Sequence, residues 1–283
     1  MAVQSAHHVA PNLFVTASNG VKYAYRRFGK TGGTPLLFLQ HFRGGLDNWD
    51  PLLTDTISAE REVILFDNTG VGLSEGTVPT TVLEMAHDAI AFLDSLKLEQ
   101  VDVLGFSLGG FVAQELALLR PLQVRKLILA GTGPQGGPSM HGWQKEIADA
   151  VRKPDIGGEE LLFAFFAHTP TSQAKGMEFL GRFMARTEDR GPMCTIEAFS
   201  RQYDAVVEWG ISDHAKLARL ESIAQPTLVA NGESDLMIPA KLTHLMGGLI
   251  PNAKVAIYPD AAHGFLFQYS VEFGAEVLKF LAS

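Results

Sequence analysis

One serine between two glycines is the first candidate for chemistry in this sequence. Ser107 stands in the segment Gly105-Phe106-Ser107-Leu108-Gly109, at the spacing G-x-S-x-G. An apolar run ends at Phe106, and apolar residues at helical spacing continue to Pro121. A strand that turns directly into a helix has no room for side chains beside the turn. The glycines fit such a turn, which holds a serine hydroxyl out as a nucleophile. A turn without chemistry is the alternative for the pentapeptide alone.

A serine hydroxyl is a weak nucleophile and needs a base, which is in turn oriented by an acid. Asp235 follows the apolar run 226–231, and His263 follows the last strand-like run, 253–258. In an open parallel sheet, the loops after the carboxyl ends of the strands converge at one edge. The chain order Ser, Asp, His is the order expected for that architecture. We therefore predict a catalytic triad of Ser107, His263 and Asp235.

Each partner of the serine has an alternative reading. Asp235 could serve as a cap for the helix that follows Pro239. The rival acid is Asp260, only three residues before His263, which makes its approach to the far nitrogen of the ring awkward. The other histidines lack the combination of order and position that His263 has.

The negative charge that develops on a substrate carbonyl needs two N–H donors. We expect one from the peptide of Leu108, directly after the nucleophile, and the other from Phe42, in the loop after the apolar run 35–40. Losing such a donor typically lowers the rate about 10²- to 10³-fold. The sequence shows no cluster of metal-ligating residues, and the expected chemistry requires no metal and no cofactor.

The elements that must position these residues alternate between apolar strands and amphipathic helices as far as residue 130. This order predicts an α/β fold with a mostly parallel twisted sheet and helices on both faces. From about Ser139 to Ile223 the pattern has helical runs and no good strand. We predict a core of residues 1–133 and 225–283, with residues 134–224 inserted as a helical cap or lid.

The predicted cap also holds a concentration of aromatic residues. Most of them are expected to pack its own interior. A lid over an active site must present apolar surface on its inner side, so we expect a few to face a pocket, and Trp143 is the candidate for contact with substrate.

The composition narrows the class of protein. The chain has 283 residues, of which 46% are hydrophobic and 19% are charged, which suits one large globular domain with an insertion. The net charge of -8 argues against nucleic acid and against an anionic membrane surface. The N-terminus lacks a signal pattern, and no stretch reaches the roughly 20 apolar residues of a membrane span. Cys194 is the only cysteine, which excludes an internal disulfide. We expect a cytoplasmic protein with a small-molecule substrate, and leave the oligomeric state open.

Over nearly its full length, the chain resembles the α/β-hydrolase superfamily. The resemblance rests on Gly105 to Gly109, on Gly232-Glu233-Ser234-Asp235 with Pro239, and on His263-Gly264-Phe265. The segment 67–74 is similar to the D-x-R-G-x-G-x-S segment of the family, with Thr69 where Arg is usual.

One segment departs from the family pattern. The usual H-G-F-x-G of the oxyanion loop reads Gln40-His41-Phe42-Arg43-Gly44. Phe42 still aligns with the donor position. Arg43 stands near the expected cavity, where it could meet a carboxylate or carbonyl of the substrate. The alternative is that Arg43 points to solvent or pairs with an acid of the scaffold.

A serine at the elbow argues against the dehalogenase and epoxide hydrolase branches, which resemble this fold but use Asp there. The chain is most similar to small bacterial esterases, enol-lactonases and cofactor-free haloperoxidases with a helical lid. The resemblance implies a serine hydrolase of small to medium, largely apolar carboxylic esters or lactones. The alternatives are a haloperoxidase, perhydrolase or acyltransferase with the same triad, and a receptor-like member that binds its ligand with little turnover.

Overall fold

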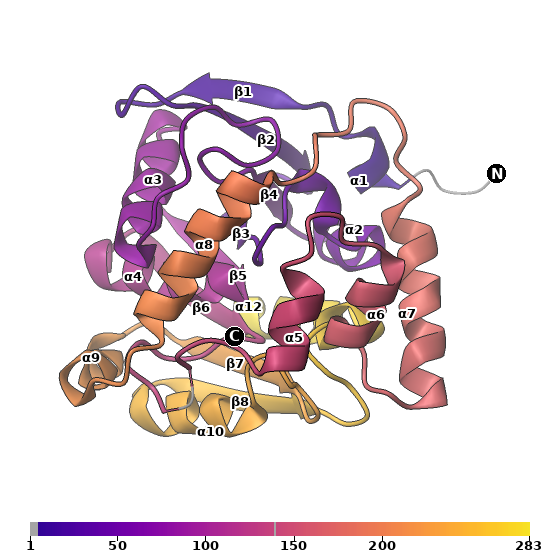
Figure 1. The fold of residues 1–283 in the computed structure, drawn as a ribbon. Helices are drawn as coiled ribbons and strands as arrows, with labels where there is room; N and C mark the ends of the chain where they lie inside the picture. The colour runs from indigo at the N-terminus through magenta and orange to yellow at the C-terminus, as the bar shows by residue number, and fades with distance from the viewer. Residues whose placement is uncertain (1–4, 139) are drawn as a thin grey trace.

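The fold is built on one sheet, which the computed structural model of the protein places at the centre of the molecule (Figure 1). The structure describes residues 5–138 and 140–283. The first four residues of the N-terminal segment, which the sequence analysis found to lack a signal pattern, lie outside the described residues. The described strands run in the order β1-β2-β4-β3-β5-β6-β7-β8. Their bounds are Leu13–Thr16 (β1), Lys22–Gly29 (β2), Leu36–Leu39 (β3), Glu62–Phe66 (β4), Val101–Phe106 (β5), Val124–Ala130 (β6), Thr227–Gly232 (β7) and Ala253–Tyr258 (β8).

All neighbouring pairs from β4 to β8 are parallel, whereas β2 pairs in the antiparallel sense with both of its neighbours, β1 and β4. Every residue of β3, β4 and β5 is buried, as expected for parallel strands covered on both faces. The predicted α/β fold class is therefore confirmed.

Helices cover both faces of the sheet (Figure 1). On one face α2 packs against α12, on the other α3 packs against α4, and α10 packs against β7 and β8. The bounds are Ala6–Val9 (α1), Leu46–Asn48 (η1, a 3₁₀ turn), Pro51–Ser58 (α2), Val82–Ser95 (α3), Leu108–Leu119 (α4), Ala240–Leu249 (α10), Phe265–Gln268 (α11) and Ser270–Ala282 (α12).

Charged residues alternate with apolar ones along β2, a pattern that favours a strand at the edge of the sheet, and the structure contradicts this expectation. β1 is the edge strand, and β2 lies between β1 and β4. The charged side chain that suggested exposure, Arg26, is completely buried because its guanidinium donates to Asp47 and to Asn12.

Between β6 and β7 the described chain forms only helices, and we call these helices and their connections the cap. They are α5 (Lys145–Val151), α6 (Gly158–Phe165), α7 (Pro170–Phe183), α8 (Ile196–Trp209), α9 (His214–Ala218) and η2 (Arg219–Ser222). Figure 1 shows α5, α6 and α8 in front of the sheet. The inserted helical cap is confirmed, while its boundaries at residues 134 and 224 stay a prediction.

Helical periodicity in the sequence predicts one helical run from Thr195 to Leu220, but the structure interrupts it. α8 ends at Trp209, and at the next residue, Gly210, a side chain would overlap the carbonyl group of Met140. Asp213 then caps a new helix, with its carboxylate accepting from two backbone N–H groups.

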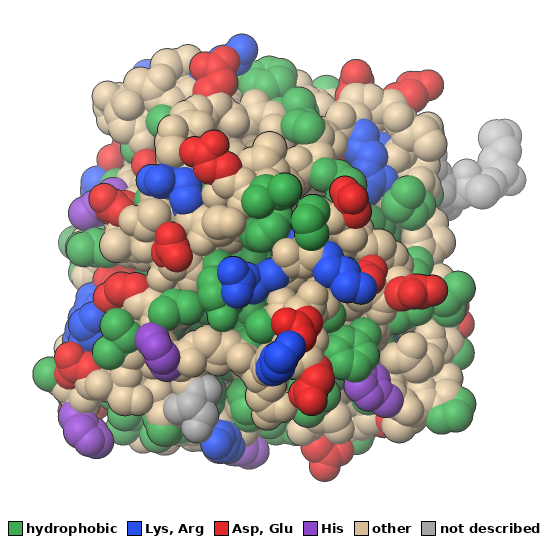
Figure 2. Space-filling view, in the orientation of Figure 1, with side chains coloured by type: hydrophobic (Ala, Val, Ile, Leu, Met, Phe, Trp, Pro, Cys, Tyr) green, Lys and Arg blue, Asp and Glu red, His purple; other side chains and the backbone are tan. Residues whose placement is uncertain are grey.

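The face of the molecule that carries the cap mixes acidic and basic side chains without a continuous stripe of either sign (Figure 2). Within residues 5–138 and 140–283, no helix combines the length and apolarity that crossing a membrane requires.

Candidate active site

Ser107 occupies the sharp turn between β5 and α4. Its backbone has φ 56° and ψ -119°, a conformation that L-residues rarely adopt. The carbonyl of Ser107 accepts a hydrogen bond from Thr132 Oγ1 at 2.8 Å. A Cβ at Gly105 would overlap the carbonyl group of Gly109, and a Cβ at Gly109 would overlap that of Leu39. Close contact between strand and helix therefore explains both glycines.

Asp235 and His263 meet after the ends of β7 and β8. His263 Nδ1 lies 2.8 Å from Asp235 Oδ2, and both side chains are buried. The other carboxylate oxygen, Oδ1, accepts from the backbone N–H groups of Met237 and Ile238 at 2.8 and 2.9 Å. A carboxylate can only accept, so Nδ1 of His263 carries the proton and Nε2 holds the free lone pair. Asp235 thus orients the imidazole and also fixes the turn after β7, whereas α10 begins after Pro239 without a side-chain cap, so Asp235 is not the cap of that helix.

Ser107 and His263 line the same cavity, which has a volume of about 470 Å³. Nε2 of His263 is buried and has no hydrogen-bond partner within the described residues, so Ser107 Oγ is not bonded to it here. Catalytic hydrogen bonds often tighten only when substrate is bound. The rival acid, Asp260, accepts from Thr169 Oγ1 at 2.7 Å, while Asp235 occupies Nδ1 of the ring.

The atypical residues of the oxyanion loop hold its backbone. The Gln40 side chain accepts from the His41 N–H at 2.8 Å and donates to the Gly45 carbonyl at 3.1 Å. His41 Nδ1 donates to the carbonyl of Phe42 at 2.8 Å. These roles of Gln40 and His41 were missed from the sequence. The feature of the sequence that could have indicated these roles is the pair of polar residues directly after the apolar run of the buried strand β3.

The two expected oxyanion donors have free N–H groups. Phe42 lines the cavity, and Leu108 is the first residue of α4, next to Ser107. Neither backbone N–H donates a hydrogen bond to an acceptor in residues 5–138 or 140–283. Both are therefore available to a substrate oxygen.

A second imidazole, that of His41, also lines the cavity. Its ring packs edge-on against Phe106 and Phe165, at centroid distances of 5.3 and 5.2 Å. Burial lowers the pKa of His41 to about 3, so the ring is neutral at physiological pH.

The two residues expected to contact substrate have different positions. Arg43 lines the cavity, yet its guanidinium binds backbone carbonyls of the cap, and among the described residues it forms no ion pair with an acid. Trp143 is not among the residues that line the cavity. Its ring packs against Phe42 and Tyr203, at centroid distances of 5.1 and 5.3 Å.

Most of the cavity wall is apolar and comes from the cap. The cap contributes Val151, Ile156, Leu161, Phe165, Leu180, Phe183, Met184 and Met193. Polar side chains also line it, namely Asp47, Asn48, Asp67 and Arg190. A largely apolar wall with a few polar groups is typical of sites for small molecules.

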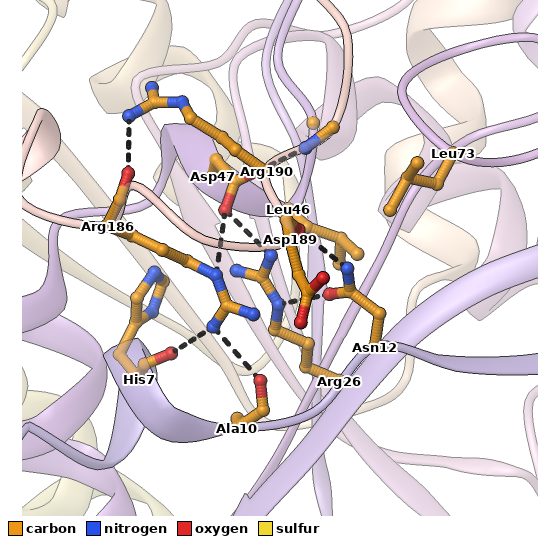
Figure 3. Close-up of polar contacts among 12 residues, drawn as sticks. His7, Ala10, Asn12, Arg26, Leu46, Asp47, Leu73, Arg186, Asp189 and Arg190 are labelled. Carbon is orange, nitrogen blue, oxygen red and sulfur yellow. Dashed lines mark hydrogen bonds and ion pairs between the residues drawn. The ribbon is translucent and has the colours of Figure 1, made fainter.

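Asp47 is held in a network of charges beside the cavity (Figure 3). Arg26 from β2 donates to its carboxylate at 2.7 Å, and the backbone N–H of Gly191 donates at 2.8 Å. Arg186, which follows α7, lies 3.8 Å from the same carboxylate and donates to the carbonyl of Ala10 at 3.0 Å. The network joins the N-terminal segment, the sheet and the cap.

Asp67, which follows β4, supports the loops around the cavity. Its two oxygens accept from the backbone N–H groups of Leu46 at 2.7 Å and Leu73 at 2.8 Å. Burial raises the pKa of this carboxyl to about 7, against the lowering effect of the two N–H donors.

The comparisons with known proteins agree with this architecture. A family model described as the alpha/beta hydrolase fold matches residues 34–268. The solved structure of an alpha/beta hydrolase fold protein from Chitinophaga pinensis is 40% identical, covers 98% of this chain and 99% of that one, and superposes with a TM-score of 0.93. The structure of Est816, described as an N-acyl homoserine lactone degrading enzyme, is 27% identical, with 95% and 100% coverage and a TM-score of 0.71.

Among curated proteins, a putative carbamate hydrolase, RutD, of Azorhizobium caulinodans is 28% identical over 82% of this chain and 85% of its own length. The match of the family model spans most of the chain and includes the strands and loops that carry the candidate site. The chain belongs to the alpha/beta hydrolase fold family.

Proposed function

We propose that the protein is a serine hydrolase of small to medium, largely apolar carboxylic esters or lactones, with Ser107, His263 and Asp235 as its catalytic triad. The observation that carries the proposal is the shared cavity. Ser107 stands on a sharp turn and His263, paired with Asp235 at 2.8 Å, opens onto the same space.

In the first half of the reaction, Ser107 Oγ attacks the carbonyl carbon of the substrate while its proton passes to His263 Nε2. The N–H groups of Phe42 and Leu108 stabilise the negative charge on the carbonyl oxygen. The tetrahedral intermediate then collapses, the bond to the leaving oxygen breaks, and His263 returns the proton to that oxygen. An acyl group remains on Ser107.

In the second half, water attacks the acyl carbonyl and gives its proton to His263 Nε2. Collapse of the second intermediate releases the carboxylic acid, and the proton returns to Ser107 Oγ. The charge on His263 is balanced by Asp235 at both stages, because the carboxylate stays hydrogen bonded to Nδ1.

The cavity supports the substrate class. Its volume of about 470 Å³ lies within the range of about 300 to 1,000 Å³ typical of small-molecule sites. The cap lines it mainly with aliphatic, methionine and phenylalanine side chains, which favour an apolar acyl or alcohol group. The name of the relative Est816 adds support for a lactone.

Replacing the nucleophile tests the proposal. Ser107→Ala should abolish turnover of p-nitrophenyl butyrate and covalent labelling by a fluorophosphonate probe, because the only proposed nucleophile is gone. Ser95→Ala is the matched control, since Ser95 lies at the end of α3 and donates to the carbonyl of Phe92. Labelling of Ser107→Ala at the wild-type level would overturn the assignment.

Two further assays separate the alternatives. Peroxide-dependent bromination by the wild type would favour a perhydrolase or haloperoxidase that uses the same residues. A ligand bound equally well by wild type and Ser107→Ala, with no turnover across a panel of esters and lactones, would favour a receptor-like protein.

A further inference from the structure

Arg43, the residue after the proposed oxyanion donor Phe42, has an unusual backbone. Its φ of 68° lies in the left-handed region, which costs free energy for any residue with a Cβ atom. The His41 carbonyl accepts from the Gly44 N–H at 3.0 Å, which closes a turn with Arg43 at its third position. Turns with positive φ at this position usually have glycine there. Contacts elsewhere must therefore hold Arg43 in this conformation.

The contacts of the Arg43 side chain all come from the cap. Its guanidinium donates to the carbonyls of Val151 at 3.1 Å, Lys153 at 2.6 Å and Pro154 at 3.0 Å, at and just beyond the end of α5. The same group stacks over the ring of Phe199, in α8, at 4.1 Å. Arg43 is only 8% exposed, so these hydrogen bonds are largely protected from competing water.

The backbone of Arg43 is also held by the cap. Its N–H donates to Gln202 Oε1 at 2.8 Å, and Gln202, in α8, is fully buried. The carbonyl of the same peptide, that of Phe42, accepts from His41 Nδ1. Both ends of the peptide between Phe42 and Arg43 are thus fixed, one by the core and one by the cap.

These contacts determine the direction of the proposed donor. In a trans peptide the N–H points opposite to the C=O. Because the His41 carbonyl points at the Gly44 N–H, the Phe42 N–H points away from the turn. The turn exists only while Arg43 keeps its left-handed conformation, and that conformation depends on contacts with the cap.

We propose that Arg43 and Gln202 are positioning residues through which the cap assembles the oxyanion hole. The inference rests on the proposed serine hydrolase function. It gives the cap a part in transition-state stabilisation in addition to lining the cavity. When the cap is displaced, Arg43 loses its partners, its backbone relaxes, and the Phe42 N–H no longer points to the oxyanion.

A pair of substitutions at Arg43 separates backbone conformation from side-chain contact. Both Arg43→Gly and Arg43→Ala remove every guanidinium contact, yet glycine adopts positive φ without strain and alanine does not. We expect kcat for p-nitrophenyl butyrate to fall in the order wild type, Gly, Ala. The Ala variant should approach the 10²- to 10³-fold loss of a missing oxyanion donor, with little change in KM.

Substitutions at Gln202 test the partner from the cap. Gln202→Met keeps the length of the side chain and removes the acceptor, so kcat should fall. Gln202→Glu keeps an acceptor oxygen for the Arg43 N–H and should retain more of kcat than Met does. Folding of each variant is checked by circular dichroism and thermal unfolding. If the Gln202 variants fail to fold, the comparison of Arg43→Gly with Arg43→Ala tests the inference by itself.

Arg201→Ala is the matched control. Arg201 neighbours Gln202 in α8 and donates to the carbonyl of Val78, so it joins cap and core without touching the oxyanion loop. We expect wild-type kcat from it. Inhibition by phenylboronic acid, which forms a tetrahedral adduct on a serine, should weaken in parallel with kcat/KM in the Arg43 and Gln202 variants.

Any of four results would overturn the inference. Equal kcat in Arg43→Gly and Arg43→Ala would exclude the backbone as the cause. Unchanged kcat with raised KM would make Arg43 a substrate-binding residue. If kcat fell as far in Arg201→Ala as in the Arg43 variants, the effect would come from weaker attachment of the cap in general, with no specific role for Arg43. Full activity of Ser107→Ala would instead overturn the proposed function itself. If Ser107→Ala is inactive but the Arg43 and Gln202 variants keep wild-type activity, only this inference is overturned.

Discussion

At the scale of single residues, the two oxygens of Asp235 have separate partners. Oδ1 accepts from the backbone N–H groups of Met237 and Ile238, and Oδ2 accepts from His263 Nδ1. Donors on one oxygen fix the rotation of the carboxylate. The tautomer of His263 is therefore determined by a group that cannot turn away.

Asp235→Asn should reverse that tautomer. The amide oxygen stays with the two backbone donors, so the NH₂ group faces His263 Nδ1, which must then accept. The proton moves to Nε2, which can no longer take the proton of Ser107. We expect kcat for p-nitrophenyl butyrate to fall about 10⁴-fold with the fold intact. Asp260→Asn is the control and should keep wild-type kcat, and unimpaired turnover by Asp235→Asn would contradict the proposed triad.

The sequence allowed Ser107, Asp235 and His263 to be chosen because their positions after strands imply one sheet edge. The surroundings of Arg43 and Trp143 could not be predicted in this way. The partners of Arg43 are carbonyls that follow a short cap helix, more than 100 residues away along the chain, as the separations of 108 to 111 residues show. The path of a long side chain depends on such contacts, and residue type carries no information about them.

At the scale of elements, the turn from β5 into α4 depends on close approach to β3. The α-carbon of Gly109 faces the carbonyl of Leu39 so closely that a Cβ would overlap it. Backbone atoms of a central strand cannot shift without disturbing the neighbouring strands. The sequence motif thus records a packing constraint in addition to its proposed catalytic role.

Gly109→Ala should therefore destabilise the protein strongly. We expect the free energy of unfolding, measured with urea, to fall by about 3 kcal/mol or more. Gly248→Ala is the matched control within α10, where an added Cβ meets no atom within 4 Å. That substitution should raise stability by about 0.5 to 1 kcal/mol, since alanine favours helix over glycine. A mild effect of Gly109→Ala would show that the strand and helix can separate.

Elements with strong periodicity were predictable, and the cap was only partly so. β3, β4 and β5 are buried along their whole length and appear in the sequence as largely apolar runs. The helical run expected from Thr195 to Leu220 is broken because Gly210 packs against the carbonyl of Met140, a contact between distant segments. Helical periodicity alone does not register such a contact.

At the scale of the whole molecule, arginines join the cap to the core. Arg182 of α7 binds the buried carboxylate of Asp50 through two hydrogen bonds, at 2.9 and 2.6 Å. Four residues later, Arg186 reaches Asp47 and the carbonyls of the N-terminal segment (Figure 3). A buried charge left without its partner costs about 3 to 5 kcal/mol. Opening of the cap on this side therefore disrupts interactions of the core itself.

The N-terminal segment that takes part in this attachment contains a buried histidine. His7, in α1, is 1% exposed, and its ring Nδ1 lies 2.9 Å from Thr54 Oγ1. Its backbone N–H donates to Asp55 Oδ1 at 2.9 Å. Burial, followed by the charge of Arg26, lowers the pKa of His7 from 6.5 to about 3.

This lowered pKa makes the protein sensitive to acid. Between pH 6.5 and about 3 the unfolded chain binds a proton at His7 that the native protein does not bind, so stability is present above pH 6.5 and is lost as the pH falls. Between pH 7 and pH 5, the free energy of unfolding of the wild type, measured with urea, should fall by about 2 kcal/mol more than that of His7→Asn. His87→Asn, an exposed histidine in α3, should keep the wild-type slope. An equal slope in His7→Asn would mean that His7 binds a proton as readily in the native protein as in the unfolded chain, which would contradict the lowered pKa.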